Sequence, residues 1–164
     1  MLIWLASYLA RFYHGFQVFH YCLMHTHFHL AVRIESVKLF SKSLQWLKWK
    51  YTKNYNKARK RRGTVWQGRF ASLVIENEKY LRACGEYIEQ NPVKAGIVRR
   101  AEQWPYSSSR FYEKRVVDNL VDRYEWGGEL PKIEGEGERF FEKGSGIGSP
   151  LFRLHIREGY ITVP

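Results

Sequence analysis

The sequence predicts an α+β fold in which an antiparallel sheet packs against helices, and three patterns indicate it. Residues 17–24 (QVFHYCLM) and 27–34 (HFHLAVRI) are rich in β-forming side chains and are separated only by His25-Thr26, which is typical of neighbouring strands of a hairpin. Residues 36–58 form the longest helical pattern. A further strand-like segment, 64–75, precedes a second helical pattern that ends near Gln90.

Local signals support each element in turn. The apolar residues 2–13 predict a first helix, which Gly15 can end. Within 36–58 the apolar side chains recur at helical spacing and leave a basic opposite face; they are Leu39, Phe40, Leu44, Leu47 and Tyr51. Residues 57–63 predict a basic loop, and Gly68 predicts a bulge or kink in the strand-like segment that follows.

The second half of the chain is less regular. Asn77 is a suitable N-cap for the second long helix, which Asn91-Pro92 is expected to stop, and residues 93–99 can form one short helix. Residues 127–150 hold seven of the thirteen glycines, which predicts a linker or an irregular lobe. Residues 151–163 are expected to supply one more strand. We therefore place a first domain at 1–112 and a glycine-rich extension at 113–164.

The positive charge of the chain is confined to one block. The 164 residues carry a net charge of +11, yet residues 36–75 contain no Asp or Glu. Eleven basic side chains lie there: Lys38, Lys42, Lys48, Lys50, Lys53, Lys57, Arg59, Lys60, Arg61, Arg62 and Arg69. The other 124 residues hold 16 basic and 16 acidic side chains and sum to zero. A field this concentrated favours a polyanion, most simply nucleic acid; the alternative is a solvated basic face that serves solubility alone.

The sequence argues against a disulfide-bonded protein, a thiolate zinc site, a membrane span and a signal peptide. Cys22 and Cys84 lie far apart without a CxxC spacing, which argues against a disulfide framework or a thiolate zinc site and fits a reducing cytoplasm. No apolar run reaches the length of a membrane span. The apolar residues 2–10 lack a basic leader and a cleavage site, so we interpret them as part of a core helix.

Two small groups of residues are candidates for chemistry. His25, His27 and His29 alternate along the chain, and with the period of a strand all three would project from one face, where neutral imidazoles can bind a divalent cation. Tyr87 and Asn91 lie four residues apart on one face of the second helix. A metal beside a phosphate could ease attack by the phenol oxygen, and the Asn91 amide oxygen could complete the metal shell. The alternatives are structural histidines, a half-buried tyrosine and a plain helix stop, and Tyr80 is a rival tyrosine on the same face.

Four segments in order resemble the single-tyrosine HUH transposases, and among them the REP-associated tyrosine transposases. They are His27-Phe28-His29, the segment 65–70 (VWQGRF), the segment 87–96 (YIEQNPVKAG) and the segment 104–108 (WPYSS). The resemblance covers roughly residues 15–110. It implies a ferredoxin-like antiparallel sheet with helices, so that the first predicted domain is the HUH transposase-like catalytic domain of a DNA strand transferase.

The resemblance also implies a mechanism for a bacterial, cytoplasmic enzyme. His27 and His29 would bind Mg²⁺ or Mn²⁺, Asn91 would assist the metal, and Tyr87 would attack a phosphate of single-stranded DNA near a hairpin of the REP type. A 5′-phosphotyrosine and a free 3′-hydroxyl would result, and reversal would join strands. The residues expected to hold the DNA are Lys48, Lys50, Lys53, Arg59, Lys60, Arg61, Arg62, Trp66 and Arg69, with further stacking candidates among Trp46, Trp49, Tyr51 and Tyr55.

The sequence departs from the family's pattern in two places. The family usually has Pro-Asn before its HUH motif, whereas this chain has His25-Thr26; His25 could add a ligand, and we favour a role in capping the strand. The chain also opens inside the family's first helix, so we expect a sheet that lacks the family's first strand, with residues 151–163 pairing at the exposed edge. A non-catalytic DNA-binding remnant and an unrelated histidine-metal hydrolase are the alternative functions. We expect a monomer, with a homodimer as the alternative.

Overall fold

A computed structural model describes residues 16–66, 73–75, 77–122 and 159–163 of the chain. In chain order the elements are β1 (Phe16–Leu23), β2 (Phe28–Ile34), α2 (Val37–Ala58), β3 (Leu73–Ile75), α3 (Glu78–Glu89), α4 (Asn91–Lys94), the 3-10 turn η1 (Ala101–Gln103), α5 (Ser109–Lys114) and β4 (Gly159–Val163). The α+β prediction is therefore confirmed. The predicted helix over 2–13, Gly68 and the glycine-rich stretch over 127–150 lie outside the described residues.

The strands form one antiparallel sheet in the order β1-β2-β4-β3. β1 and β2 are the predicted hairpin, and the amide of Met24 donates to the carbonyl oxygen of His27 (2.9 Å) to close its turn. Residues 151–163 were expected to supply a strand at the exposed edge of the sheet; their described part, β4, instead pairs with β2 on one side and β3 on the other. A segment distant in sequence thus occupies an inner position of the sheet.

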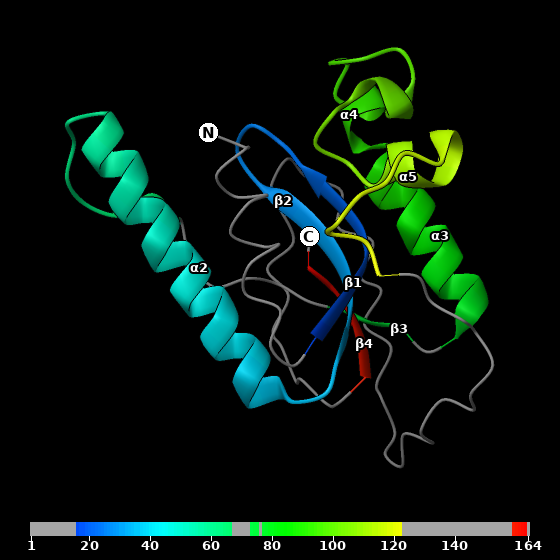
Figure 1. Ribbon diagram of the computed structural model, residues 1–164, viewed down its shortest axis with the longest axis horizontal. Coiled ribbons are helices and arrows are strands. Elements are labelled where there is room, and N and C mark those ends of the chain that lie inside the picture. Colours follow the sequence, from blue (N-terminus) through cyan, green and yellow to red (C-terminus); the bar gives the residue numbers. More distant parts are fainter. Residues whose placement is uncertain (1–15, 67–72, 76, 123–158, 164) are drawn as a thin grey trace, which may run out of the picture.

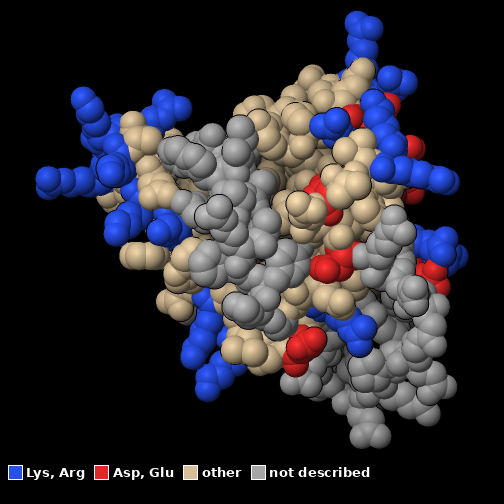
Figure 2. Space-filling view, in the orientation of Figure 1, with Lys and Arg blue, Asp and Glu red and all other residues tan. Residues whose placement is uncertain are grey.

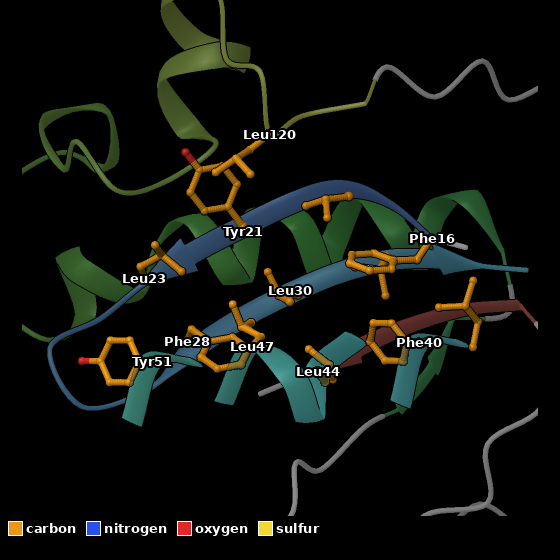
Figure 3. Packing of buried hydrophobic residues seen from close by; sticks show 13 residues of the cluster. Phe16, Tyr21, Leu23, Phe28, Leu30, Phe40, Leu44, Leu47, Tyr51 and Leu120 are labelled. Atoms are coloured by element: carbon orange, nitrogen blue, oxygen red, sulfur yellow. The ribbon is translucent and has the colours of Figure 1, made fainter. Parts of the chain in front are cut away.

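Helices cover both faces of this sheet. In Figure 1, α2 stands on one side, while α3, α4 and α5 lie together on the other. The first hydrophobic core lies between the sheet and α2, where Phe16 meets Phe40 edge to face at 5.2 Å between ring centroids. Figure 3 shows the α2 side chains that fill this core from below the strands, namely Phe40, Leu44, Leu47 and Tyr51.

The sequence of α2 accounts for both its boundaries and its orientation. The Ser36 hydroxyl accepts a hydrogen bond from the Leu39 amide (3.4 Å) and so caps the first turn. The four buried side chains are spaced by four, three and four residues and therefore form one stripe. Because that stripe is the apolar one, the remaining positions, which carry the lysines, point away from the sheet.

A β-bulge in β1 shapes the opposite face. The pairing of β1 with β2 shifts between Val18 and His20. Val18 therefore faces α2, whereas both Phe19 and His20 face α3, and Cys22 continues on that side. The second hydrophobic core, between the sheet and α3, is formed by Phe19, Cys22, Met24, Ala31, Ile75, Leu81, Ile88 and Trp104.

Two sequence predictions need correction, and one helix was not predicted. Residues 64–66 were expected to be strand, but they run along α2, because the indole nitrogen of Trp66 donates to the Lys48 carbonyl oxygen (3.0 Å) and its ring packs on Tyr51. The short helix expected over 93–99 is α4, which begins at Asn91 and ends at Lys94. α5 was not predicted. No helix within the described ranges is both long and apolar enough to cross a membrane.

Candidate functional site

The two histidines of the HUH motif lie side by side at the start of β2. His29 is inside the strand, opposite Cys22 of β1, and therefore points toward the face that α3 covers. His27 lies one residue before the strand begins, and its ring centroid is 4.8 Å from that of His29 with the planes almost perpendicular. The prediction that His27 and His29 share a face is consistent with this arrangement.

His25 does not continue the alternation, because it belongs to the bend before the strand. Its ring is exposed and meets Trp104 edge to face at 5.4 Å. Met24 and His27 close the turn around it through a backbone hydrogen bond. His25 therefore lies outside β2, although its ring contacts Trp104 of the second hydrophobic core, which His29 also faces.

Burial lowers the pKa of both neighbouring imidazoles and so favours their neutral form. Burial, and then the proximity of His27, lowers the pKa of His29 to about 4, and burial also lowers the pKa of His27. His29 is only 7% exposed, and its Nε2 atom is buried with no hydrogen-bond partner among the described residues. A neutral imidazole with a buried, unsatisfied nitrogen is the form that ligates a metal. His27 and His29 therefore fit a divalent cation, although within the described residues no group of three or more His, Cys, Asp or Glu side chains is placed to hold one.

Tyr87 approaches this pair from α3. The Asn77 side chain accepts a hydrogen bond from the Tyr80 amide (2.8 Å) and so begins the helix as predicted. Leu81, Gly85, Ile88 and Glu89 form the buried face, which leaves Tyr87 54% exposed at its margin. Its ring centroid is 6.4 Å from that of His29. Two residues that are 58 positions apart in sequence thus meet at one end of the sheet.

Tyr80 differs from Tyr87 in its surroundings. It lies two turns earlier on α3 and packs, partly buried, against the second hydrophobic core. Tyr87 is 54% exposed and its ring contacts that of His29, whereas Tyr80 is partly buried against the core. This comparison favours Tyr87 as the chemically accessible phenol.

Asn91 connects α3 to α4. Its side-chain nitrogen donates to the backbone oxygens of Tyr87 (2.9 Å) and Ile88 (3.1 Å), so the amide satisfies carbonyl groups at the end of α3. Asn91 therefore does act as the helix stop that the sequence allowed. Because the nitrogen is engaged in this way, Oδ1 is the atom that remains for a metal.

Lys94 was not singled out from the sequence, and the fold brings it to Tyr87. The short helix α4 carries it back across the end of α3, and its ammonium nitrogen lies 3.9 Å from the centroid of the Tyr87 ring. The seven-residue spacing would have placed the two side chains on one face of an unbroken helix. That spacing is the signal that could have revealed the pair.

A buried polar network attaches the same helix to the sheet. His20 Nδ1 and Glu89 Oε1 are 2.9 Å apart, and the Ser108 hydroxyl donates to the same carboxylate oxygen (2.7 Å). A carboxylate only accepts, so the imidazole carries its proton on Nδ1. His20 also stacks on Tyr112 with ring centroids 4.6 Å apart. The sequence signal for this network is Glu89, an acidic residue that falls on the otherwise apolar stripe of α3.

Gly85 explains how α3 comes so close to β1. A Cβ atom at this position would lie 2.5 Å from Cε1 and Nε2 of His20. The imidazole therefore occupies the space that any other residue's side chain would need. A cavity of about 240 Å³ opens beside this contact, lined in part by Arg82, Glu86 and Tyr112, and Tyr87 is not among its lining residues.

The basic block forms one surface of the molecule. On the left of Figure 2, blue side chains gather over α2 and the segment after it, without red among them. Of the residues predicted to hold DNA, Lys53, Arg59, Lys60, Arg61 and Arg62 are exposed, and Lys48 and Lys50 are half-buried. Arg69 lies outside the described residues. We call the described members of this set the α2 basic surface.

Cations on this surface lie over aromatic rings. Lys53 is 5.3 Å from the centroid of Trp49, Lys50 is 6.0 Å from that of Trp46, and Arg61 is 5.6 Å from that of Tyr55. Among the stacking candidates, Trp49 is 54% exposed, whereas Tyr51 is buried in the first core. Trp66 packs edge to face on Phe28 at 5.9 Å, so part of its ring serves the core as well.

Comparisons with known proteins agree with this arrangement. The family model described as IS200-like transposase matches residues 7–91. A Haemophilus influenzae protein named as a REP-associated tyrosine transposase is 30% identical over 135 residues, which cover 76% of this chain and 74% of that protein. A REP-associated tyrosine transposase of Escherichia coli is 35% identical over 75 residues, covering 46% of this chain and 42% of that protein. No solved structure matches.

The family match spans the hairpin, α2, α3 and the residues of the candidate site up to Asn91. The resemblance inferred from the four sequence segments is confirmed by it. This chain belongs to the IS200-like transposase family.

Proposed function

We propose that this transposase cuts and rejoins single-stranded DNA, with Tyr87 as the nucleophile. The observation that carries the proposal is the meeting of Tyr87 with His29, whose ring centroids lie 6.4 Å apart. An exposed phenol beside the His29 imidazole, which in turn lies next to His27, is suited to attack on a phosphate that a metal polarises. The family membership supports the same reaction class.

The proposed reaction is a transesterification. The Tyr87 phenol oxygen forms a bond to phosphorus, the bond from phosphorus to the 3′-oxygen of the preceding nucleotide breaks, and the phenol proton is taken up in exchange by that oxygen. The products are a 5′-phosphotyrosine and a free 3′-hydroxyl. Because one phosphodiester replaces another, the step requires no ATP, and attack by a second 3′-hydroxyl reverses it.

His27 and His29 are the residues that would hold Mg²⁺ or Mn²⁺, with Asn91 Oδ1 as a third ligand. The buried, unsatisfied Nε2 of His29 and the lowered pKa values of both histidines support this choice. A divalent cation bound there supplies Lewis-acid polarisation of a phosphate oxygen. Asn91 also fixes the end of α3 and so orients Tyr87.

The α2 basic surface is the proposed path of the DNA backbone. Lys53 and Arg59 to Arg62 offer charge to phosphates, and the exposed Trp49 offers a stacking face. This combination is typical of proteins that bind single-stranded DNA without sequence specificity. The proposed substrate is a single strand that flanks a hairpin, and the proposed state is a monomer.

A covalent-adduct assay tests the proposal. Purified chain is incubated with labelled hairpin oligonucleotides and Mn²⁺, and adducts that survive denaturation are separated on a gel. We expect an adduct with the wild-type chain and with Tyr80→Phe, and none with Tyr87→Phe. A persistent adduct in Tyr87→Phe would contradict the assignment.

The same assay separates the alternatives. Salt-sensitive DNA binding without any cut under Mn²⁺ would indicate the non-catalytic binding remnant. Cleavage that leaves no protein–DNA bond would indicate a hydrolase. If two differently inactivated variants form an active dimer when they are mixed, the proposed monomer is contradicted.

A further inference from the structure

The cation beside Tyr87 stands out among the cation–ring pairs. Lys94 Nζ lies 3.9 Å from the Tyr87 ring centroid, whereas the other such pairs in the described residues span 5.3 to 6.0 Å. At 3.9 Å the ammonium is in contact with the ring face. Tyr87 is nevertheless 54% exposed.

Local structure fixes this approach. The Asn91 side chain ties the turn between α3 and α4 to the backbone of Tyr87 and Ile88, and the Lys94 amide donates to the Gln90 carbonyl oxygen (2.9 Å). Gly96 follows with a φ of 68° and ends the turn. The lysine therefore leaves the backbone seven residues after Tyr87, from a turn that these hydrogen bonds hold in place.

The ammonium is also chemically uncommitted. In the described part of the chain, Lys94 forms no ion pair with a carboxylate; the ion pairs there involve Glu78, Glu89 and Glu102. Lys94 is thus the positive side chain in contact with the nucleophile.

We propose that Lys94 is a further catalytic residue, whose ammonium binds a non-bridging oxygen of the phosphate that Tyr87 attacks. This inference rests on the proposed function. Attack by the phenol oxygen increases the negative charge on the phosphate oxygens in the transition state, and a cation fixed beside the ring stabilises that charge. The same contact then binds the phosphotyrosine. Lys94 transfers no proton in this step.

Three variants test the role. Lys94→Met keeps the aliphatic length and removes the charge, Lys94→Arg keeps the charge, and Lys79→Met removes an exposed lysine from the first turn of α3. Lys79 precedes Tyr87 by eight residues, which places it about 12 Å along the helix axis. It therefore controls for a general loss of positive charge.

The measurement is the single-turnover rate of adduct formation at saturating DNA, together with the Kd for uncut DNA in a Tyr87→Phe background. We expect Lys94→Met to lower the rate about 10- to 100-fold, Lys94→Arg to recover most of it, and Lys79→Met to stay within about twofold of wild type. Far smaller changes are expected in Kd, since one phosphate contact among many is lost.

Each outcome bears on the inference. A wild-type rate in Lys94→Met, or an equal loss in Lys79→Met, overturns the role of Lys94 and leaves Tyr87 as the nucleophile. A loss in Lys94→Met that is confined to Kd also overturns it. If the wild-type chain forms no adduct, or Tyr87→Phe forms one, the proposed function fails, and the Lys94 inference fails with it.

Discussion

The contact between Gly85 and His20 gives the most sharply defined perturbation in the structure. In an exposed helix, replacing glycine by alanine stabilises by about 1 kcal/mol. At Gly85 the added Cβ would lie 2.5 Å from two atoms of the His20 ring, so α3 or the imidazole must move by about 1 Å to reach an ordinary contact distance. His20 is 6% exposed, bonded to Glu89 and stacked on Tyr112, which opposes its movement.

We therefore expect Gly85→Ala to destabilise the fold. Overpacking a buried contact costs about 1–3 kcal/mol, and strain on the His20–Glu89–Ser108 network adds to this cost. After the gain in helix propensity, the expected net loss is about 2 kcal/mol, which corresponds to a fall in Tm of roughly 4–8 °C for a chain of this size. Circular dichroism during thermal and urea unfolding measures both quantities.

The matched controls are Ala83→Gly and a double-mutant cycle. Ala83 is exposed on α3, so its replacement by glycine should cost only the propensity term of about 1 kcal/mol. His20→Ala removes the ring that the new Cβ meets, so the double variant should be less destabilised than the sum of the singles by about 1 kcal/mol or more. A Gly85→Ala protein more stable than wild type, or strictly additive effects, would refute the reasoning.

Three further predictions concern the network, the histidine pair and the basic surface. Glu89→Ala leaves the His20 and Ser108 donors without their shared acceptor and should cost about 2–4 kcal/mol in urea unfolding; a loss below about 0.5 kcal/mol would contradict the network's role. His29 titrates near pH 4 when folded and near 6.5 when unfolded, so the unfolded state binds more protons between these values. The free energy of unfolding of the wild type should therefore fall by about 2 kcal/mol from pH 7 to pH 5. The fall should be smaller in His29→Asn. If the two proteins differ in stability by the same amount at every pH, the prediction is contradicted. Replacing Lys50 and Lys53 by Gln should lower the salt slope of single-stranded DNA binding by roughly 1.4, with Lys114→Gln as the unchanged control; equal slopes would remove α2 from the DNA path.

The regular elements could be predicted because their signals are local. The hairpin follows from two β-rich segments around His25-Thr26, α2 from its apolar stripe, and α3 from its Asn77 cap. The segment 64–66 was predicted wrongly because the hydrogen bond from Trp66 to Lys48, eighteen residues away, determines its course. α5 is only six residues long, and it owes its place to contacts such as Tyr112 with Phe19, which local propensity does not register.

In the candidate site, too, residues with local sequence signals were predicted and residues brought together by long-range contacts were not. His27, His29, Tyr87 and Asn91 follow from motifs at fixed spacing, and each occupies a place compatible with its predicted role. His20 and Glu89, by contrast, are 69 residues apart in sequence, and only the packing of α3 on the bulged strand β1 brings them together. The contact of Lys94 with Tyr87 could not be predicted with certainty, because it depends on the turn between α3 and α4. The seven-residue spacing only suggests the geometry of that turn. Pairings across the fold were thus the part that sequence reasoning missed.

The identity of the nucleophile is the central claim, and peptide mapping of the covalent adduct tests it most directly. Arg82 lies between Tyr80 and Tyr87, so trypsin separates the two tyrosines into different peptides. After nuclease trimming of the bound DNA, mass spectrometry should find the phosphonucleotide on the peptide that contains Tyr87, residues 83–94. A modification on the Tyr80 peptide, or on any residue other than Tyr87, would contradict the account.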